Sequence, residues 1–162
     1  MTDIINKITS YNLFNYLFPG TLFVLIATKW TVYDFQVENI ILGGFLYYFI
    51  GMTISRIGSL FIEKVLKKSK LVKFSDYKDF VSCSKKDDRI NLFSEINNTY
   101  RTLISLGVCL LLTKLYSELD IIINIPEIIT TFGLIILIIL LYVFSHQKQT
   151  EYINKRIKAN KD

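Results

Sequence analysis

Residues 127–145 read EIITTFGLIILIILLYVFS, an almost unbroken apolar run whose only charged residue is Glu127. The hydrocarbon core of a bilayer is ~30 Å thick, and an α-helix needs roughly 20 apolar residues to cross it. Three more apolar runs of similar length lie at residues 13–30, 40–62 and 102–119. The pattern therefore predicts an all-α, polytopic membrane protein with four transmembrane helices.

The distribution of charge, more than the overall composition, supports this fold class. Hydrophobic residues make up 51% of the 162 residues, close to what soluble proteins contain. Charged residues, however, concentrate between the apolar runs. We expect one domain, residues 1–162, with a basic connection at 63–101, a polar helical tail at 147–162, and no separate soluble domain.

Basic residues also lie almost entirely on one side of the four runs. Of 19 lysines and arginines, only Lys29 and Lys114 fall near the opposite side. The connections on that side are acidic and carry Asp34, Glu38, Glu118, Asp120 and Glu127. The positive-inside rule then places both termini and the 63–101 connection in the cytoplasm.

The first apolar run has unusual features near its start. We expect its helix to begin close to Thr2, and no small-residue cleavage site follows the run, so it stays in the mature protein. Polar amides at the start of a span can line water or bond to another helix. A proline removes one helical hydrogen bond and kinks the helix, either as a gate hinge or to fix packing. The candidate pore or gating residues here are Asn12, Asn15, Tyr16, Pro19 and Gly20.

Arg56 is the sixth candidate of this kind, because it lies inside the inner boundary of the second run. Charges within a membrane are costly and usually face a bundle interior or a wet cavity. One interpretation makes Arg56 a pore-vestibule charge or a partner for Glu63 or Glu95. The other is that its long side chain reaches the inner lipid headgroups.

Small residues recur at helical spacing along the second run. They are Gly44, Gly51, Ser55 and Gly58. Small residues let helices approach closely in lipid, where packing replaces the hydrophobic driving force. We predict that this stripe forms a helix–helix contact, either within one chain or between chains.

The basic connection and tail form the candidate ligand surface. The lysines that follow the second run are expected to extend its helix beyond the membrane, and Ser75 is expected to cap a short helix after them. Three functions are open: contact with anionic lipids, binding of a nucleotide or single-stranded nucleic acid, or docking of a protein. The candidate residues are Lys64, Lys67, Lys68, Lys70, Lys73, Lys85, Lys86, Arg89, Lys155, Arg156 and Lys158.

Catalytic constellations are not visible in this sequence. There is no nucleophile–base pair, paired carboxylate or phosphate-binding glycine loop, and a single histidine with two cysteines offers no metal-ligand spacing. We therefore expect a protein that is not an enzyme and that uses neither a cofactor nor a metal.

Four segments carry a resemblance to a known family. They are NLFNYLFPG at 12–20, YYFIG at 47–51, SRIGS at 55–59 and NNTYRT at 97–102. They resemble a family of small bacterial four-span membrane proteins, and the size and layout also resemble the membrane effectors of anti-phage systems, the Hailong-type effector first and the Kiwa membrane subunit second. The Hailong resemblance implies an oligomeric channel that a bound oligonucleotide holds closed, with a nucleotidyltransferase as its partner and no catalytic residue.

Together these observations favour a pore-forming or channel-like effector that lies in the lipid bilayer and assembles as a homo-oligomer, with a tetramer favoured. The alternative is a non-conducting membrane anchor that recruits a soluble partner. A small transporter is a third hypothesis, although no inverted repeat is visible in the sequence.

Overall fold

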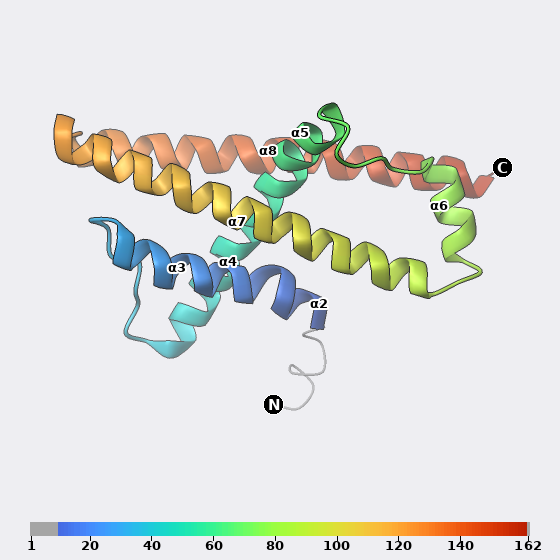
Figure 1. Ribbon diagram of the computed structural model, residues 1–162, viewed down its shortest axis with the longest axis horizontal. Helices are drawn as coiled ribbons and strands as arrows, with labels where there is room; N and C mark the ends of the chain where they lie inside the picture. The colour runs from blue at the N-terminus through green and yellow to red at the C-terminus, as the bar shows by residue number, and fades with distance from the viewer. Residues whose placement is uncertain (1–9, 162) are drawn as a thin grey trace.

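The computed structural model describes residues 10–161, which form helices with no β-strand among them (Figure 1). The first helix runs through α2 (Ser10–Asn12), the π-helical segment η1 (Leu13–Leu17) and α3 (Phe18–Trp30). The second runs through α4 (Ile40–Ile57), the π-helical η2 (Gly58–Ile62) and α5 (Glu63–Lys68). The predicted all-α class is confirmed, and the helix start expected near Thr2 lies outside the described residues.

Three further helices complete the chain: α6 (Tyr77–Ser84), α7 (Arg89–Ile123) and α8 (Glu127–Lys161). The basic segment before residue 102 and the predicted third span form one continuous helix, α7. Likewise, the predicted fourth span and the polar tail form one helix, α8. Apolar and polar parts of the sequence are therefore joined in single continuous helices.

Local signals explain most helix ends. The Asn39 side chain accepts hydrogen bonds from the backbone of Ile41 and Leu42 at 3.0 and 3.1 Å and so caps α4. Asn124 ends α7 in the left-handed conformation, with φ of 54°, which asparagine tolerates better than most residues.

Two expected boundaries are wrong. The cap of α6 is Asp76, not Ser75, since the Asp76 carboxylate accepts from the Lys78 backbone at 2.9 Å. The second helix stops at Lys68, and Lys70 has φ of 61°, so Lys70 and Lys73 lie in a loop instead of on an extended helix.

The predicted disturbance at Pro19 takes the form of a π-helical segment. Segment η1 ends at Leu17, two residues before the proline. Proline cannot donate the regular bond to the residue four positions earlier, and a wider π turn adapts the backbone to that loss. The helix continues through Pro19 to Trp30 without a break.

Within residues 10–161, two helices are long and apolar enough to cross a membrane: Ile40–Lys68 and Glu127–Asn160. Only 22% and 11% of their most apolar windows are buried within the chain. Large apolar side chains of α8, including Ile128, Phe132 and Ile136, are more than half exposed. Apolar helices that remain this open require lipid or a partner protein to cover them.

The helices are arranged with their connections at opposite ends (Figure 1). Helices α7 and α8 run in opposite directions along the long axis, α3 lies beside α7, and α4 crosses them steeply. The connection between α3 and α4 meets the end of α7, where the Val32 backbone donates to Ser117 Oγ at 3.2 Å and Tyr33 to Asp120 at 2.6 Å. Segment α2, helix α6 and the end of α8 lie toward the other end.

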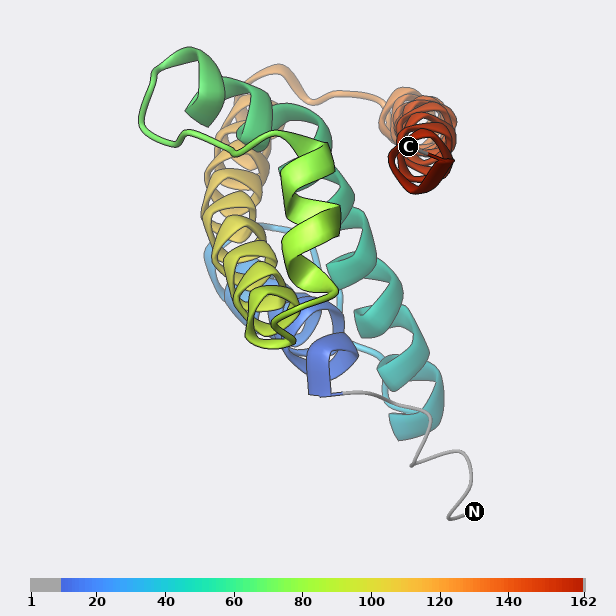
Figure 2. The same cartoon turned by 90° about the vertical axis from the view of Figure 1, so that its right-hand side faces the viewer.

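The core is the contact of α3, α4 and α7. Phe23, Val24 and Ala27 of α3 pack there with Ile54 of α4 and Leu106 of α7. Helix α8 lies outside this core. Viewed along its axis in Figure 2, α8 stands apart from α3 and α7, and its neighbours are α4 and α6.

The closest approach in the core is a reciprocal glycine contact between α3 and α4. A Cβ added at Gly20 would overlap the backbone oxygen of Tyr47, and one added at Gly51 would overlap that of Tyr16. Each glycine therefore lies against the backbone four residues before the other. Only a residue without a side chain permits this distance.

We predict that Gly51→Ala destabilises the protein by about 1–3 kcal/mol, because its methyl group forces the two backbones apart. Gly44→Ala is the matched control on the same helix, since nothing lies within 4 Å of a Cβ added there. The free energy of unfolding in detergent–SDS mixed micelles measures both. Equal values for the two variants would contradict the close contact.

Candidate functional site

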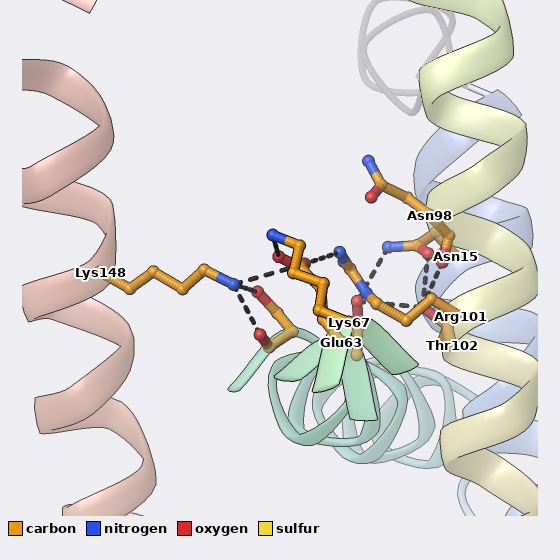
Figure 3. Close-up of polar contacts among 9 residues, drawn as sticks. Asn15, Glu63, Lys67, Asn98, Arg101, Thr102 and Lys148 are labelled. Atoms are coloured by element: carbon orange, nitrogen blue, oxygen red, sulfur yellow. Dashed lines mark hydrogen bonds and ion pairs between the residues drawn. The ribbon is translucent and has the colours of Figure 1, made fainter. Parts of the chain in front are cut away.

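Three buried polar side chains connect the helices of the core, one each from the segments η1, α4 and α7 (Figure 3). Asn15 Nδ2 donates to Ser55 Oγ at 3.1 Å, and Thr102 Oγ1 donates to Asn15 Oδ1 at 2.7 Å. The hydroxyl oxygens of Ser55 and Thr102 lie 3.2 Å apart. Asn15 and Thr102 are 0% exposed and Ser55 is 4% exposed. Unpaired polar groups at this depth would be costly, so the three groups require one another.

This network determines where the candidate gating residues lie. Asn15 faces the helix contact, and Pro19 and Gly20 are also buried there. Tyr16 is partly buried and makes edge contacts with the rings of Tyr11 and Tyr48. Asn12 is partly buried one turn earlier. In the described chain Asn15, Pro19 and Gly20 therefore lie at the contact between helices.

A charged cluster around Glu63 lies beside the buried network (Figure 3). Glu63 Oε1 is 2.9 Å from Lys67 Nζ, and Oε2 is 2.8 Å from an Arg101 guanidinium nitrogen and 3.4 Å from Lys148 Nζ. Lys148 also donates to the backbone oxygen and hydroxyl of Ser59 at 2.6 and 2.9 Å. One carboxylate, 8% exposed, therefore joins α5, α7 and α8.

The cluster contains more positive than negative charge. Burial alone raises the pKa of Glu63, but the hydrogen bond from Lys67 and the charges of Lys148 and Arg101 outweigh it, so the pKa lies below its usual range. Burial lowers the pKa of Lys148, and Glu63 opposes that effect. The charges interact strongly because the surroundings are partly dry.

Arg56 does not join this cluster. It is partly buried and lines a small hollow between α4 and α8. Within residues 10–161 it has no hydrogen bond or ion pair, so neither Glu63 nor Glu95 is its partner. Arg101 and Lys148 occupy the positions at Glu63 that the sequence suggested for Arg56.

Of the four small residues along the second helix, three contact another helix and Gly44 does not. Gly51 meets the backbone of Tyr16, Ser55 belongs to the buried network, and a Cβ at Gly58 would lie 3.3 Å from the Arg101 backbone oxygen. Gly44, in contrast, has open space around it. Its side of α4 is free for contact with lipid or with another chain.

The candidate ligand residues are all exposed, and they occupy α5 and the loop after it, the turn between α6 and α7, and the end of α8. Lys85 Nζ donates to Asn160 at 2.6 Å, which brings the turn against the tail. Two aromatic side chains between these lysines have partners within the chain: Lys67 lies over the Phe74 ring at 4.1 Å, and Tyr77 contacts Tyr152. The basic surface is therefore built from segments far apart in the sequence.

Sequence reasoning missed Thr102, Arg101 and Lys148 as members of these clusters. Glu63 carried one detectable signal, because it is an acidic residue that directly follows a predicted span and precedes a run of lysines. Its partners at positions 101 and 148 belong to other helices, and only the packing of those helices brings them together.

Comparisons with protein-family models, with curated proteins and with solved structures found no match for this chain.

Thr102→Val tests the buried network. Valine keeps the shape of threonine but leaves Asn15 Oδ1 without its donor, and we expect a loss of about 0.5–2 kcal/mol in the free energy of unfolding. Thr99→Val is the matched control, because the Thr99 hydroxyl bonds only the backbone of its own helix, at Glu95. Chemical unfolding in micelles measures the free energy of unfolding of both variants. An equal loss in Thr102→Val and Thr99→Val would contradict a role of the network in joining the helices.

Glu63→Gln tests the charged cluster. We expect a loss of roughly 1–3 kcal/mol at neutral pH, because three cations lose their shared carboxylate but keep some solvent. The pKa of Glu63 is lowered from 4.5, so its contribution is present above that pH and disappears as the pH falls through the folded-state pKa.

Wild type and Glu63→Gln should therefore converge in stability in acid. The control is Glu95→Gln, at an exposed position of α7, which should leave the pH profile unchanged. A constant difference between wild type and Glu63→Gln at all pH values would contradict the lowered pKa.

Proposed function

We propose that this chain is a four-span protein of the bacterial inner membrane with both termini in the cytoplasm. It assembles as a homo-oligomer, with a tetramer favoured, and acts as a pore-forming or channel-like effector that is controlled from its basic side. It has no catalytic role. The observation that carries the proposal is the attachment of α8, which contacts the other helices chiefly through α4, α6 and the Glu63 cluster.

The helix arrangement supports four spans. The short connections meet at one end through Tyr33 and Asp120, α6 and the end of α8 lie toward the other end, and α5 lies between them (Figure 1). The steep crossing of α4 and α8 is compatible with a bilayer because both helices exceed the minimum length. The 29 residues of Ile40–Lys68 extend about 43 Å, so that helix crosses a ~30 Å core even when strongly tilted.

The charges at the basic end suggest how the protein is controlled. Repulsion among Lys67, Arg101 and Lys148 opposes the attraction of each to Glu63, and Lys85 lies against the end of α8 at Asn160. A polyanion that bound there would neutralise the repulsion and hold α8 in place. Its release would free α8 to move away from α4 and open a path between helices.

This mechanism agrees with the resemblance to effectors of the Hailong type. In this mechanism the channel is closed while an oligonucleotide is bound to the chain, and it opens when the oligonucleotide is released during infection. A soluble nucleotidyltransferase is then the partner that makes the ligand, and loss of membrane potential is the outcome.

The anchor hypothesis remains the second candidate because one observation favours it. Asn15, a polar residue near the start of the first predicted span, is fully buried and hydrogen bonded to Ser55 and Thr102. The polar groups of the described core are thus used for packing. A protein that only recruits a partner would need no more than this.

Ion flux from liposomes separates the two candidates. We expect Glu63→Gln to raise flux about tenfold over wild type, since a loss of ~1.4 kcal/mol from the closed state shifts its equilibrium by that factor. Glu95→Gln is the control and should behave as wild type. An oligonucleotide should reduce wild-type flux, less so at high salt.

If neither wild type nor Glu63→Gln conducts ions under any of these conditions, the channel proposal is wrong. The mass of the detergent-solubilised protein tests assembly separately, and a strict monomer would contradict the homo-oligomer.

A further inference from the structure

A small polar hollow lies between the end of α4 with η2 on one side and the middle of α8 on the other, and it shares Lys148 with the Glu63 cluster. Its volume is about 20 Å³, and it is lined by Arg56, Ser59, Leu60, Ser145, Lys148, Gln149 and Tyr152. A space of this size holds about one water molecule or one oxygen atom of a larger group. It is partly open, so a ligand can insert one atom and keep the rest outside.

The lining of the hollow is suited to an anionic oxygen. It has two cations, Arg56 and Lys148, and no carboxylate among its lining residues. Lys148 is held in position by its bonds to Ser59 at 2.6 and 2.9 Å. Arg56 has no hydrogen bond or ion pair within residues 10–161, although a guanidinium carries five donors.

Neighbouring charges strengthen the attraction for an anion. Glu63 is the acidic partner of Lys148, and it also serves Lys67 and Arg101. One carboxylate therefore faces three cations, and Arg56 adds a fourth cation nearby. The positive excess is close to a partly buried surface, where electrostatic interactions are stronger than in water.

We propose that this hollow binds one oxygen of a phosphate group, and that in the cell the group belongs to the headgroup of an anionic phospholipid. The lipid source rests on the proposed membrane placement. Arg56 lies near the inner end of the second span, and Ser145 and Lys148 lie at the inner end of the fourth. Phospholipid headgroups occupy that level, and basic pockets between spans on the cytoplasmic side bind them.

A bound headgroup would have a structural consequence. Arg56 belongs to α4, and Lys148 belongs to α8, so one phosphate would join both helices at a point where the chain provides few other contacts. The lipid would then stabilise α8 against α4, independently of any ligand on the exposed lysines.

Native mass spectrometry of the full chain in micelles tests the site, with titrations of phosphatidylglycerol, phosphatidylcholine and inorganic phosphate. The main variant is Gln149→Glu, which places a negative charge in the hollow from an exposed position. We expect its affinity for phosphatidylglycerol to fall at least about tenfold, as for loss of a charged hydrogen bond. Gln147→Glu, exposed on the same helix but outside the hollow, should keep the wild-type affinity.

Arg56→Gln should weaken phosphatidylglycerol binding to a similar degree, and Arg56→Lys should restore part of it. Binding of inorganic phosphate that Gln149→Glu abolishes, without any lipid preference, would support the phosphate site and overturn the lipid source. Equal affinity of wild type, Gln149→Glu and Gln147→Glu for phosphatidylglycerol would overturn the site itself.

The measurement does not depend on ion conduction. A channel proposal refuted by the flux assay leaves the expected lipid binding unchanged. Recovery of the chain in the soluble fraction after an alkaline wash of membranes would instead refute the membrane placement on which the lipid source rests.

Discussion

The close contact of α3 with α4 is the constraint on which the rest of the structure depends. Gly20 and Gly51 each pack against the backbone of the other helix, and no side chain fits between them. Because the backbones meet there, Asn15 and Ser55 come within hydrogen-bond distance one turn away. The Asn15 side chain of that pair then accepts a hydrogen bond from Thr102, and this bond holds α7 against the other two helices. A packing contact thus determines a polar one, as expected where apolar surroundings make unpaired polar groups costly.

Helix α8 depends on a different kind of interaction. It lies outside the three-helix core, and the Glu63 cluster is its principal charged attachment. A buried ion cluster adds little net stability, because desolvation offsets much of the attraction, but it depends strongly on every member. Such an attachment is sensitive to anions, to pH and to the loss of one charge.

Sequence patterns predicted several elements correctly, and the reasons are local. The all-helical class follows from long apolar runs, and a helical tail at 147–162 follows from the polar residues that continue the last run. The sequence predicts Ser75 as the cap of α6, but Asp76 caps it. Serine and aspartate both favour a cap position, and sequence alone does not rank two neighbouring residues of these types. The second helix ends at Lys68, earlier than the sequence predicts, because a run of lysines is compatible with both helix and loop.

The sequence by itself determined the helical class, the apolar runs and the separation of basic from acidic connections, because hydrophobicity and charge are properties of single residues and short segments. Only the tertiary structure decided that Asn15 is a buried link, that Gly20 is a packing residue, and that Glu63 pairs with Arg101 and Lys148 while Arg56 lines a hollow. These roles depend on which helix faces meet. That outcome follows from the joint packing of residues that are far apart in the sequence, such as Glu63 and Arg101 at 38 positions and Asn15 and Thr102 at 87, which no local pattern records.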